Sequence, residues 1–177
     1  MLPTALTSAR TAFCCALLVG ALPSFAAAQA MAAGRDSVIL ATRFADALGV
    51  RTASLGRLAA SVFVEDVMPG EGIEAKRGMV ARVRTQLFLT DGTPVRPGGC
   101  QVLQFAIGGG SIIDGVDLAV RGMRPGGSRL VVFGAERGYR DRGVAGEVPP
   151  GATLIARLQL LDVSHARFPD VNECLRT

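Results

Sequence analysis

A chain of 177 residues is long enough for one domain of ordinary size and too short for two well-buried cores once a leader is removed. Its 19 Lys and Arg against 15 Asp and Glu leave a net charge of +4, and the basic residues are spread along the chain, which argues against a nucleic-acid or membrane-binding patch. The single histidine, His165, falls in a polar tail, so a histidine-based triad or a His-ligated metal is excluded and no metal or cofactor is expected.

The first 30 residues have the organisation of a signal peptide. Arg10 precedes an apolar run over residues 12–23, and an Ala-Gln-Ala sequence at 28–30 matches the small-x-small pattern of a signal peptidase site. A transmembrane anchor is the alternative, but the run is shorter than the roughly 20 residues that a membrane span needs. We expect cleavage after residue 30, with Ala28 as the alternative cleavage point, and a mature periplasmic protein that starts at Met31.

Four cysteines fall in two pairs along the chain. Cys14 and Cys15 lie in the leader and leave with it, whereas Cys100 and Cys174 stay in the mature protein. Disulfides persist in the periplasm, so a bridge between these two is one interpretation and two unpaired thiols is the other. Spacing alone does not establish the Cα separation that a bridge requires, so both remain open.

An N-terminal extension, residues 31–57, has the pattern of a short helix. Asp36 or Ser37 can provide its N-cap, and Gly49 can end it. Apolar residues recur between these ends at helical spacing: Leu40, Phe44 and Leu48. A segment this short cannot form a core of its own, so it is either a frayed leader or a helix that packs on the main domain or on a second copy.

The main domain, residues 58–164, begins with two strands. Residues 61–67 alternate between apolar and polar side chains and end at a Pro-Gly turn. In residues 79–89 the odd positions are mostly apolar, whereas the even positions include Arg82 and Arg84. This alternation predicts a sheet with one buried face and one wet face.

A third strand and a helix follow. Residues 100–107 alternate, and three glycines at 108–110 break the strand. Ser111 is expected to cap the helix, with Asp114 completing a capping box, and an Arg-Pro-Gly-Gly sequence at 124–127 is expected to end it. The apolar stripe of this helix contains Ile112, Val116, Ala119, Val120 and Met123.

Two further strands, 128–133 and 153–163, enclose a long loop. The loop, residues 134–151, is rich in Gly and Pro and exceeds the roughly 12 to 15 residues beyond which loops tend to be functional. We therefore expect it to border the site, and residues 165–177 to form a C-terminal tail. Together the elements predict an α+β fold, in which a bent antiparallel sheet buries one face against one short α-helix.

Short blocks at characteristic spacings run through residues 61–163. Each block alone is weak because it is turn chemistry, but the ordered set is specific, above all Ile-Ile-x-Gly at 112–115 and Pro-Pro-x-Ala-Thr-Leu at 149–154. The other blocks are Pro-Gly-Glu-Gly at 69–72, Lys-Arg-Gly at 76–78, Leu-Thr-Asp-Gly at 89–92, Phe-Ala-Ile-Gly at 105–108, Met-Arg-Pro-Gly at 123–126 and Tyr139. In this order the blocks resemble an FKBP-type peptidyl-prolyl isomerase domain.

The resemblance implies a half-barrel sheet wrapped around the helix, with a pocket between them for proline-containing segments. It implies that the Tyr139 hydroxyl and the Ile113 backbone N–H each hold a substrate carbonyl. Positions that match the pocket wall are Leu103, Phe105, Ile112 and Val148. For Phe105 and Ile112, ordinary core packing is an equal alternative.

The chain departs from the family pattern in this pocket. Thr85 replaces a tyrosine, Val95 and Arg96 replace a Phe-Asp pair, Val116 replaces a tryptophan and Ala156 replaces a phenylalanine. The lost ring surface predicts a wider pocket and weak catalysis.

The function expected from the resemblance is prolyl isomerisation that assists the folding of exported proteins. Such catalysis needs no nucleophile, because a dry pocket and one or two hydrogen bonds that hold the twisted amide lower the barrier. The alternative is a non-catalytic FKBP-like binding module or chaperone. Oligomeric state and client proteins stay open.

Overall fold

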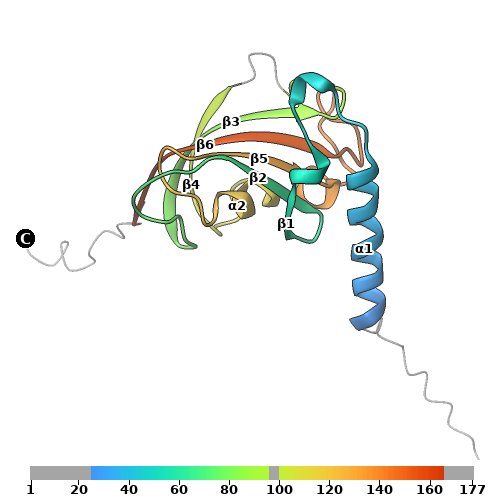
Figure 1. The fold of residues 1–177 in the computed structure, drawn as a ribbon, viewed down its shortest axis with the longest axis horizontal. Coiled ribbons are helices and arrows are strands. Elements are labelled where there is room, and N and C mark those ends of the chain that lie inside the picture. The colour runs from blue at the N-terminus through green and yellow to red at the C-terminus, as the bar shows by residue number, and fades with distance from the viewer. Residues whose placement is uncertain (1–24, 96–99, 166–177) are drawn as a thin grey trace, which may run out of the picture.

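The structure, a computed structural model, describes residues 25–95 and 100–165. Six strands form one antiparallel sheet in the order β1-β2-β5-β6-β3-β4 (Figure 1). The strands are β1 (Gly56–Ala59), β2 (Val62–Met68), β3 (Met79–Leu89), β4 (Gln101–Ala106), β5 (Ser128–Phe133) and β6 (Leu154–His165). The described helices are α1 (Phe25–Ala41) and α2 (Asp114–Val120), with 3₁₀ turns at Asp46–Leu48, Thr52–Ser54 and Ala135–Arg137. The predicted α+β class and bent antiparallel sheet are confirmed.

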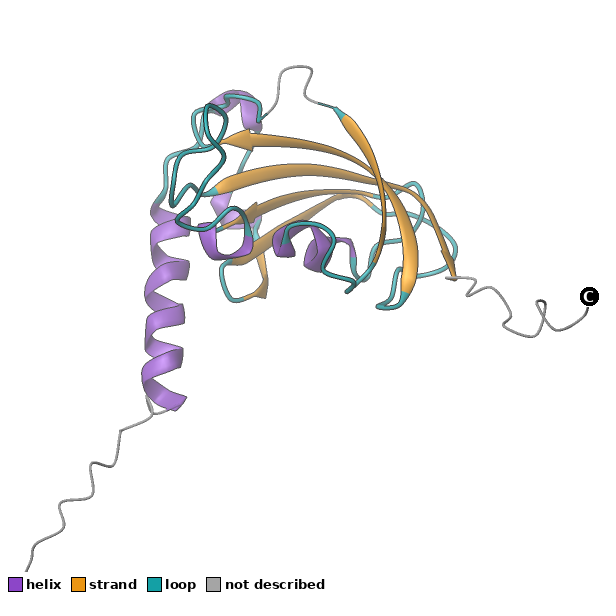
Figure 2. Ribbon diagram, turned by 180° about the vertical axis from the view of Figure 1, so that it is seen from behind, coloured by secondary structure: helices purple, strands orange, loops and turns teal. Residues whose placement is uncertain are grey.

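The two longest strands, β3 and β6, determine the bend of the sheet. They pair from Met79 opposite His165 to Leu89 opposite Leu154, with a register shift after Arg82. A β-bulge of this kind bends a strand and increases its twist. The sheet consequently arches over α2, which lies inside the curve (Figure 2).

The concave face holds the main core. Ala81 and Val83 of β3 are fully buried, whereas Arg82 and Arg84, which alternate with them, are exposed, so the predicted alternation of this strand is confirmed. Helix α2 packs its buried side chains against this face: Val116, Ala119 and Val120.

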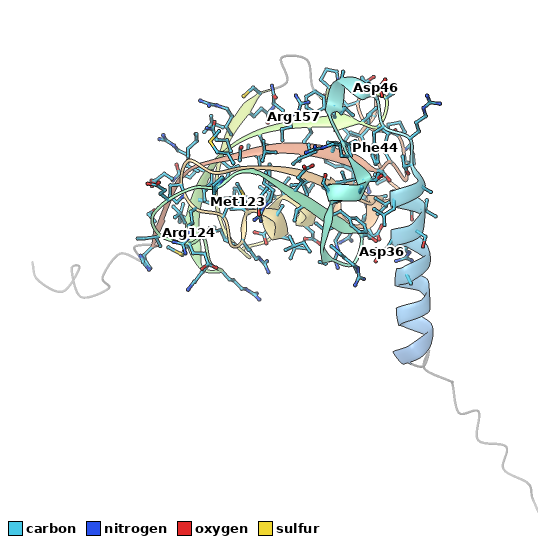
Figure 3. The ribbon with its side chains drawn as sticks, viewed as in Figure 1. Asp36, Phe44, Asp46, Met123, Arg124 and Arg157 are labelled. Carbon is cyan, nitrogen blue, oxygen red and sulfur yellow. The ribbon has the colours of Figure 1, made fainter. Side chains whose placement is uncertain are left out.

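A second core lies on the convex face, beneath residues 39–55. Its buried members are Ile39, Leu48, Phe63, Leu130, Val132 and Ile155. Phe63, Leu130 and Ile155 come from sheet positions that alternate with the concave core. Phe44 lies at the end of the sheet next to α1, and Arg124 lies toward the opposite end (Figure 3). The N-terminal extension therefore packs on the main domain.

The helix predicted between residues 37 and 49 is wrong in its boundaries. Helix α1 already runs from Phe25 and ends at Ala41, and a separate 3₁₀ turn carries the buried Leu48. The backbone leaves the helix because the Ala45 N–H donates to the carbonyl of Thr90, 2.9 Å away, across the top of the sheet. Gly49 does end a turn, with a φ of 66°, but it is the 3₁₀ turn.

The capping box predicted at Ser111 is also wrong. Helix α2 begins at Asp114 with Ile113 as its N-cap, and no side chain caps it. Residues 108–113 form turns instead, because the Asp117 carboxylate accepts the Gly108 N–H at 2.7 Å and draws this segment toward the helix. The helix ends at Val120, before the predicted stop at 124–127. The chain then turns at Gly122, whose φ is 81°.

Two differences lie at the ends of the sheet. Strand β1 was not predicted, since its four residues are almost all exposed and show no apolar alternation. His165 was placed in the tail, but it is the last residue of β6, because pairing with Met79 extends the strand past its apolar pattern. Its side chain is exposed, as expected.

Candidate functional site

A cavity of about 550 Å³ opens on the concave side of the sheet. Its walls come from β3 and β4, from the segment that leads into α2, and from the start of the 134–151 loop. The lining residues are Thr85, Leu87, Val95, Gln101, Leu103, Gly110, Ser111, Ile112, Ile113, Asp114, Val116, Glu136, Gly138, Tyr139 and Arg140. The loop thus borders the cavity, as its length predicted.

Tyr139 is held at the cavity by a compact turn. The N–H groups of Gly138 and Arg140 both donate to the carbonyl of Ala135, at 2.9 and 2.8 Å, and the Gly143 N–H donates to the carbonyl of Tyr139 at 3.0 Å. The ring is half-buried against the core. Its hydroxyl has no hydrogen-bond partner within residues 25–95 and 100–165, which leaves it free to bind a ligand.

Ile113 lies across the entrance of α2. Its carbonyl accepts the N–H groups of Val116 and Asp117 at 3.1 and 3.2 Å, while its own N–H donates to nothing in the described part of the chain. Helix α2 can pack closely against Phe133 of β5 because Gly115 has no side chain. A Cβ at Gly115 would lie 2.5 Å from the Phe133 ring.

A buried polar group of the cavity wall is also unpaired. Thr85 is only 4% exposed, and its Oγ1 atom has no hydrogen-bond partner in the part of the chain that the structure describes. A buried hydroxyl without a partner destabilises a fold or awaits a ligand or a water. Charged side chains of both signs surround the mouth: Asp114, Glu136 and Arg140.

Seven of the predicted site residues meet at this cavity. They are Thr85, Val95, Leu103, Ile112, Ile113, Val116 and Tyr139. Arg96 lies outside the described residues. Whether each of the seven touches a substrate stays a prediction.

Three other predicted wall residues do not line the cavity. Phe105, Val148 and Ala156 are buried in the concave core at 5, 4 and 0% exposure. Phe105 and Ala156 occupy inward strand positions that neighbouring side chains cover. Val148 is turned into the core by two hydrogen bonds with Val144, both of 2.8 Å.

Several lining residues were not predicted. Leu87 could have been predicted as a lining residue, because it lies two residues after Thr85 in β3 and therefore on the same face of the strand. Glu136 and Arg140 flank Tyr139 but carry no sequence signal of their own, and Asp114 was assigned to a capping box. Their places depend on how the loop folds.

The remaining chemistry of the described residues is limited. Cys100 is exposed beside β4, and Cys174 lies outside the described residues, so a disulfide between them stays a prediction. Within residues 25–95 and 100–165, no three His, Cys, Asp or Glu side chains are grouped to hold a metal ion. None of the described helices has both the length and the apolar character to cross a membrane.

The sequence of this chain is similar to known proteins of one family. Residues 71–161 match the family model of the FKBP-type peptidyl-prolyl cis-trans isomerases. The chain is 37% identical over 105 residues to an FK506-binding protein of Neisseria meningitidis, a match covering 58% of this chain and 96% of that protein. It is 35% identical over 112 residues to a chloroplastic peptidyl-prolyl cis-trans isomerase of Arabidopsis thaliana, covering 58% of this chain and 48% of that one.

Solved structures agree on the fold. A peptidyl-prolyl cis-trans isomerase from Pseudomonas syringae superimposes with a TM-score of 0.59 at 19% identity, covering 77% of this chain and 96% of that chain. The family match spans the strands, helix and loop that form the cavity. The chain belongs to the FKBP-type peptidyl-prolyl cis-trans isomerase family.

Proposed function

We propose that this protein is a weak peptidyl-prolyl isomerase that acts on X-Pro segments of exported proteins in the periplasm. The observation that carries the proposal is the cavity lined by both Tyr139 and Ile113. Each brings a polar hydrogen without a partner in the described chain, and both belong to elements that the rest of the fold holds in place.

The chemistry requires positioning and no covalent step. Rotation about an X-Pro bond has a barrier of about 20 kcal/mol and takes tens of seconds unaided. The twisted amide has lost its resonance and some of its polarity, so a dry pocket favours it over the more polar planar form, and donors to the carbonyl groups of the bound segment hold that segment in the twisted geometry. The Tyr139 hydroxyl and the Ile113 N–H are the two groups that serve as such donors here. Each 1.36 kcal/mol of differential binding accelerates rotation about tenfold.

The low rate follows from the composition of the wall. Tyr139 is the only aromatic side chain among the described lining residues. Val95 and Val116 present branched aliphatic surface where the family pattern has rings that can stack on a proline. Aromatic contacts are worth on the order of 1 kcal/mol beyond their area, so a bound proline is held less firmly.

Export is proposed from the leader sequence. The basic residue, apolar run and Ala-Gln-Ala site of residues 1–30 have the arrangement of a cleaved signal peptide. The cleavage point after Ala30 falls inside α1 and before Asp36, so cleavage retains the residues that pack on the sheet. Intact-mass measurement of the exported protein should give a chain that starts at Met31, and retention of residues 1–30 would contradict this.

A second candidate function is a non-catalytic binding module or chaperone. The aliphatic wall favours it, because a wide cavity with one ring holds extended segments without demanding a proline. The two candidates differ in one measurement, since a chaperone suppresses aggregation of an unfolded protein but does not accelerate X-Pro isomerisation.

The deciding experiment is a protease-free isomerisation assay with peptides that vary the residue before proline. Wild type should accelerate the reaction, and Tyr139→Phe should lower kcat/KM about tenfold because one hydrogen bond to the twisted amide is lost. Thr42→Val is a matched control, since it also removes a hydroxyl, but one that donates to the carbonyl of Val38 at the end of α1. Equal activity of Tyr139→Phe and wild type would refute the role of Tyr139, and no acceleration by wild type would favour the chaperone.

A further inference from the structure

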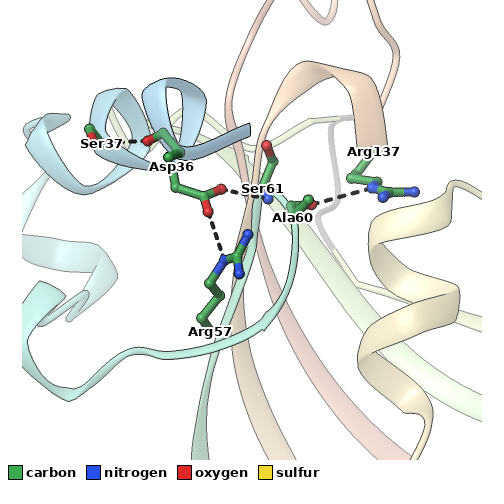
Figure 4. Close-up of polar contacts among 7 residues, drawn as sticks. Asp36, Ser37, Arg57, Ala60, Ser61 and Arg137 are labelled. Atoms are coloured by element: carbon green, nitrogen blue, oxygen red, sulfur yellow. Dashed lines mark hydrogen bonds and ion pairs between the residues drawn. The ribbon is translucent and has the colours of Figure 1, made fainter. Parts of the chain in front are cut away.

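A chain of contacts links helix α1 to the loop that carries Tyr139. It begins at Asp36, which is 8% exposed although it is charged. Its carboxylate accepts the backbone N–H of Ser61 at 2.7 Å through Oδ1 and pairs with the Arg57 Nε at 2.7 Å through Oδ2 (Figure 4). A nearly buried carboxylate with two short bonds fixes the groups that it binds.

The turn that Asp36 holds is strained. Ser61 lies between β1 and β2 with a φ of 57°, a left-handed conformation that non-glycine residues seldom adopt. Such a conformation persists only where its surroundings impose it. The Asp36 carboxylate on the Ser61 N–H is one such restraint, and the Ser61 carbonyl, which accepts the Gly134 N–H at 3.0 Å, is another.

Gly134 begins the 3₁₀ turn that leads to Tyr139, and it is closely packed. A Cβ at Gly134 would lie 2.9 Å from the Glu136 carboxylate, 3.1 Å from Cδ1 of Ile39 and 3.3 Å from Cβ of Ser61. Helix α1, the strained turn and a lining residue of the cavity therefore meet at this one position.

Arg137 completes the chain of contacts. Its Nε donates to the carbonyl of Ala60 at 3.4 Å, and its Nη1 lies 3.8 Å from the Asp114 carboxylate. Figure 4 shows this side chain reaching from the loop to the turn that Asp36 holds. Asp114 directly follows Ile113, and Arg137 precedes Tyr139 by two residues. One side chain thus contacts the turn beside α1 and the start of α2.

We propose that helix α1, through Asp36, is a positioning element of the isomerase site. Asp36 holds the Ala60–Ser61 turn, and this turn, together with Arg137, orients Tyr139 relative to Ile113. Asp36 and Arg137 are positioning residues, because neither lines the cavity. The catalytic consequence rests on the proposed isomerase function, whereas the placement of Tyr139 can be measured without it.

The chain provides its own probe of that placement. Tyr139 is the single tyrosine of the sequence, and there is no tryptophan. A tyrosine labelled at its ε ring carbons therefore gives one side-chain NMR signal, and it reports on Tyr139 alone. Variants for comparison are Asp36→Ala, Arg137→Gln and the control Arg51→Gln. Arg51 also joins the extension to the sheet, through an ion pair of 2.6 Å with Glu65, but it contacts neither the turn nor the loop.

We expect Asp36→Ala and Arg137→Gln to shift the tyrosine signal and Arg51→Gln to leave it in place. An unchanged signal in both test variants, or an equal shift in the control, would overturn the proposal. Arg137 is partly exposed, so its variant serves if Asp36→Ala does not fold.

A double-mutant cycle tests the catalytic consequence. We expect Asp36→Ala to lower kcat about tenfold in wild type but less than twofold in Tyr139→Phe, because its effect passes through the same hydroxyl. Losses that multiply in the double variant would contradict the positioning role. If wild type has no isomerase activity, the proposed function fails, and the tyrosine signal still decides whether Asp36 and Arg137 place Tyr139.

Discussion

The two faces of the sheet are built from alternate residues of the same strands but are filled differently. On the concave face a helix of two turns, α2, covers part of the surface and leaves a cavity beside it. On the convex face short turns and Ile39 cover the apolar patch around Phe63 and Ile155. The concave face combines packing with a space for a ligand, whereas the convex face anchors the extension.

Residues 33–55 stabilise the main domain by covering its convex face. Without them, Phe63, Leu130 and Ile155 would form an exposed apolar patch on a sheet whose other face is already packed. Arg157 also depends on the extension, since it donates to the carbonyls of Ala47 and Leu48 at 3.1 and 3.0 Å while its guanidinium lies 5.5 Å from the Phe88 ring centre. The extension is part of the fold, and substitutions on it should separate stability from binding.

The largest expected effect is on the convex core. Ile39→Ala should lower the free energy of unfolding by about 2 to 4 kcal/mol, because Ile39 is 3% exposed and its removal leaves a cavity under α1. The neighbouring Val38→Ala is the matched control, since Val38 is 67% exposed. Urea unfolding measures both. Equal, small losses would show that α1 does not pack on the sheet in solution.

The next effect is on the concave cavity. Val116→Trp should return a ring to the wall and tighten binding of macrolide inhibitors of FKBP-type proteins about tenfold, or 1.4 kcal/mol. Val102→Trp adds the same ring on an exposed position of β4, 54% accessible, and should leave binding unchanged. Calorimetric titration with the inhibitor compares them. No gain in the first variant would mean that the missing ring does not limit binding.

A smaller effect on stability is expected from the buried, unpaired hydroxyl of Thr85. Thr85→Val keeps the shape of the side chain and removes Oγ1, so it should stabilise the protein by about 1 kcal/mol. Thr85→Ser retains the hydroxyl and should give no such gain. The melting temperatures of the two variants decide the matter, and a loss of stability in Thr85→Val would indicate that an ordered water satisfies Oγ1.

The smallest expected effect is a pH dependence of stability that comes from an ion pair on the convex side. The Arg51 guanidinium, with a further contribution from the Ser54 hydroxyl, holds the pKa of Glu65 below its ordinary value. A carboxyl whose pKa is lower in the folded state stabilises the fold above its unfolded pKa, and this contribution is lost as the pH falls through the folded pKa.

Wild type and Arg51→Gln should therefore differ most near neutral pH and converge in acid. The comparison isolates Glu65 from Asp91, whose pKa is also lowered, by the Thr93 N–H. Thermal unfolding of both proteins between neutral and acidic pH measures the convergence, and a difference that stays constant with pH would exclude this ion pair as its origin.

Five of the six strands, the fold class and the family could be predicted from local sequence. Alternation in residues 79–89 predicts a half-buried strand because successive side chains point to opposite faces. The glycine and proline blocks mark turns, and their order resembles one family. Seven of the predicted site residues also meet at the cavity, since the motifs that carry the resemblance surround it.

Other features depended on contacts between distant residues. Asp36 and Ser61 are 25 residues apart, and Arg137 and Ala60 are 77 apart, so no local pattern connects them. The same cause misplaced the first helix, because tertiary hydrogen bonding at Ala45 overrides helical spacing. Phe105, Val148 and Ala156 carry residue types that suit a pocket wall, but which apolar residues border a cavity and which lie beneath it is decided by packing.

By itself, the sequence determined five of the six strands, most of the turns between them and the family that the chain resembles, because these follow from backbone preferences and from side-chain alternation over a few residues. Only the tertiary structure decided that the N-terminal extension covers the convex face, that Thr85 keeps an unpaired hydroxyl, and that Asp36 and Arg137 reach the loop of Tyr139. These features exist only when segments far apart in the chain are brought together, because burial and hydrogen-bond pairing are properties of the packed whole.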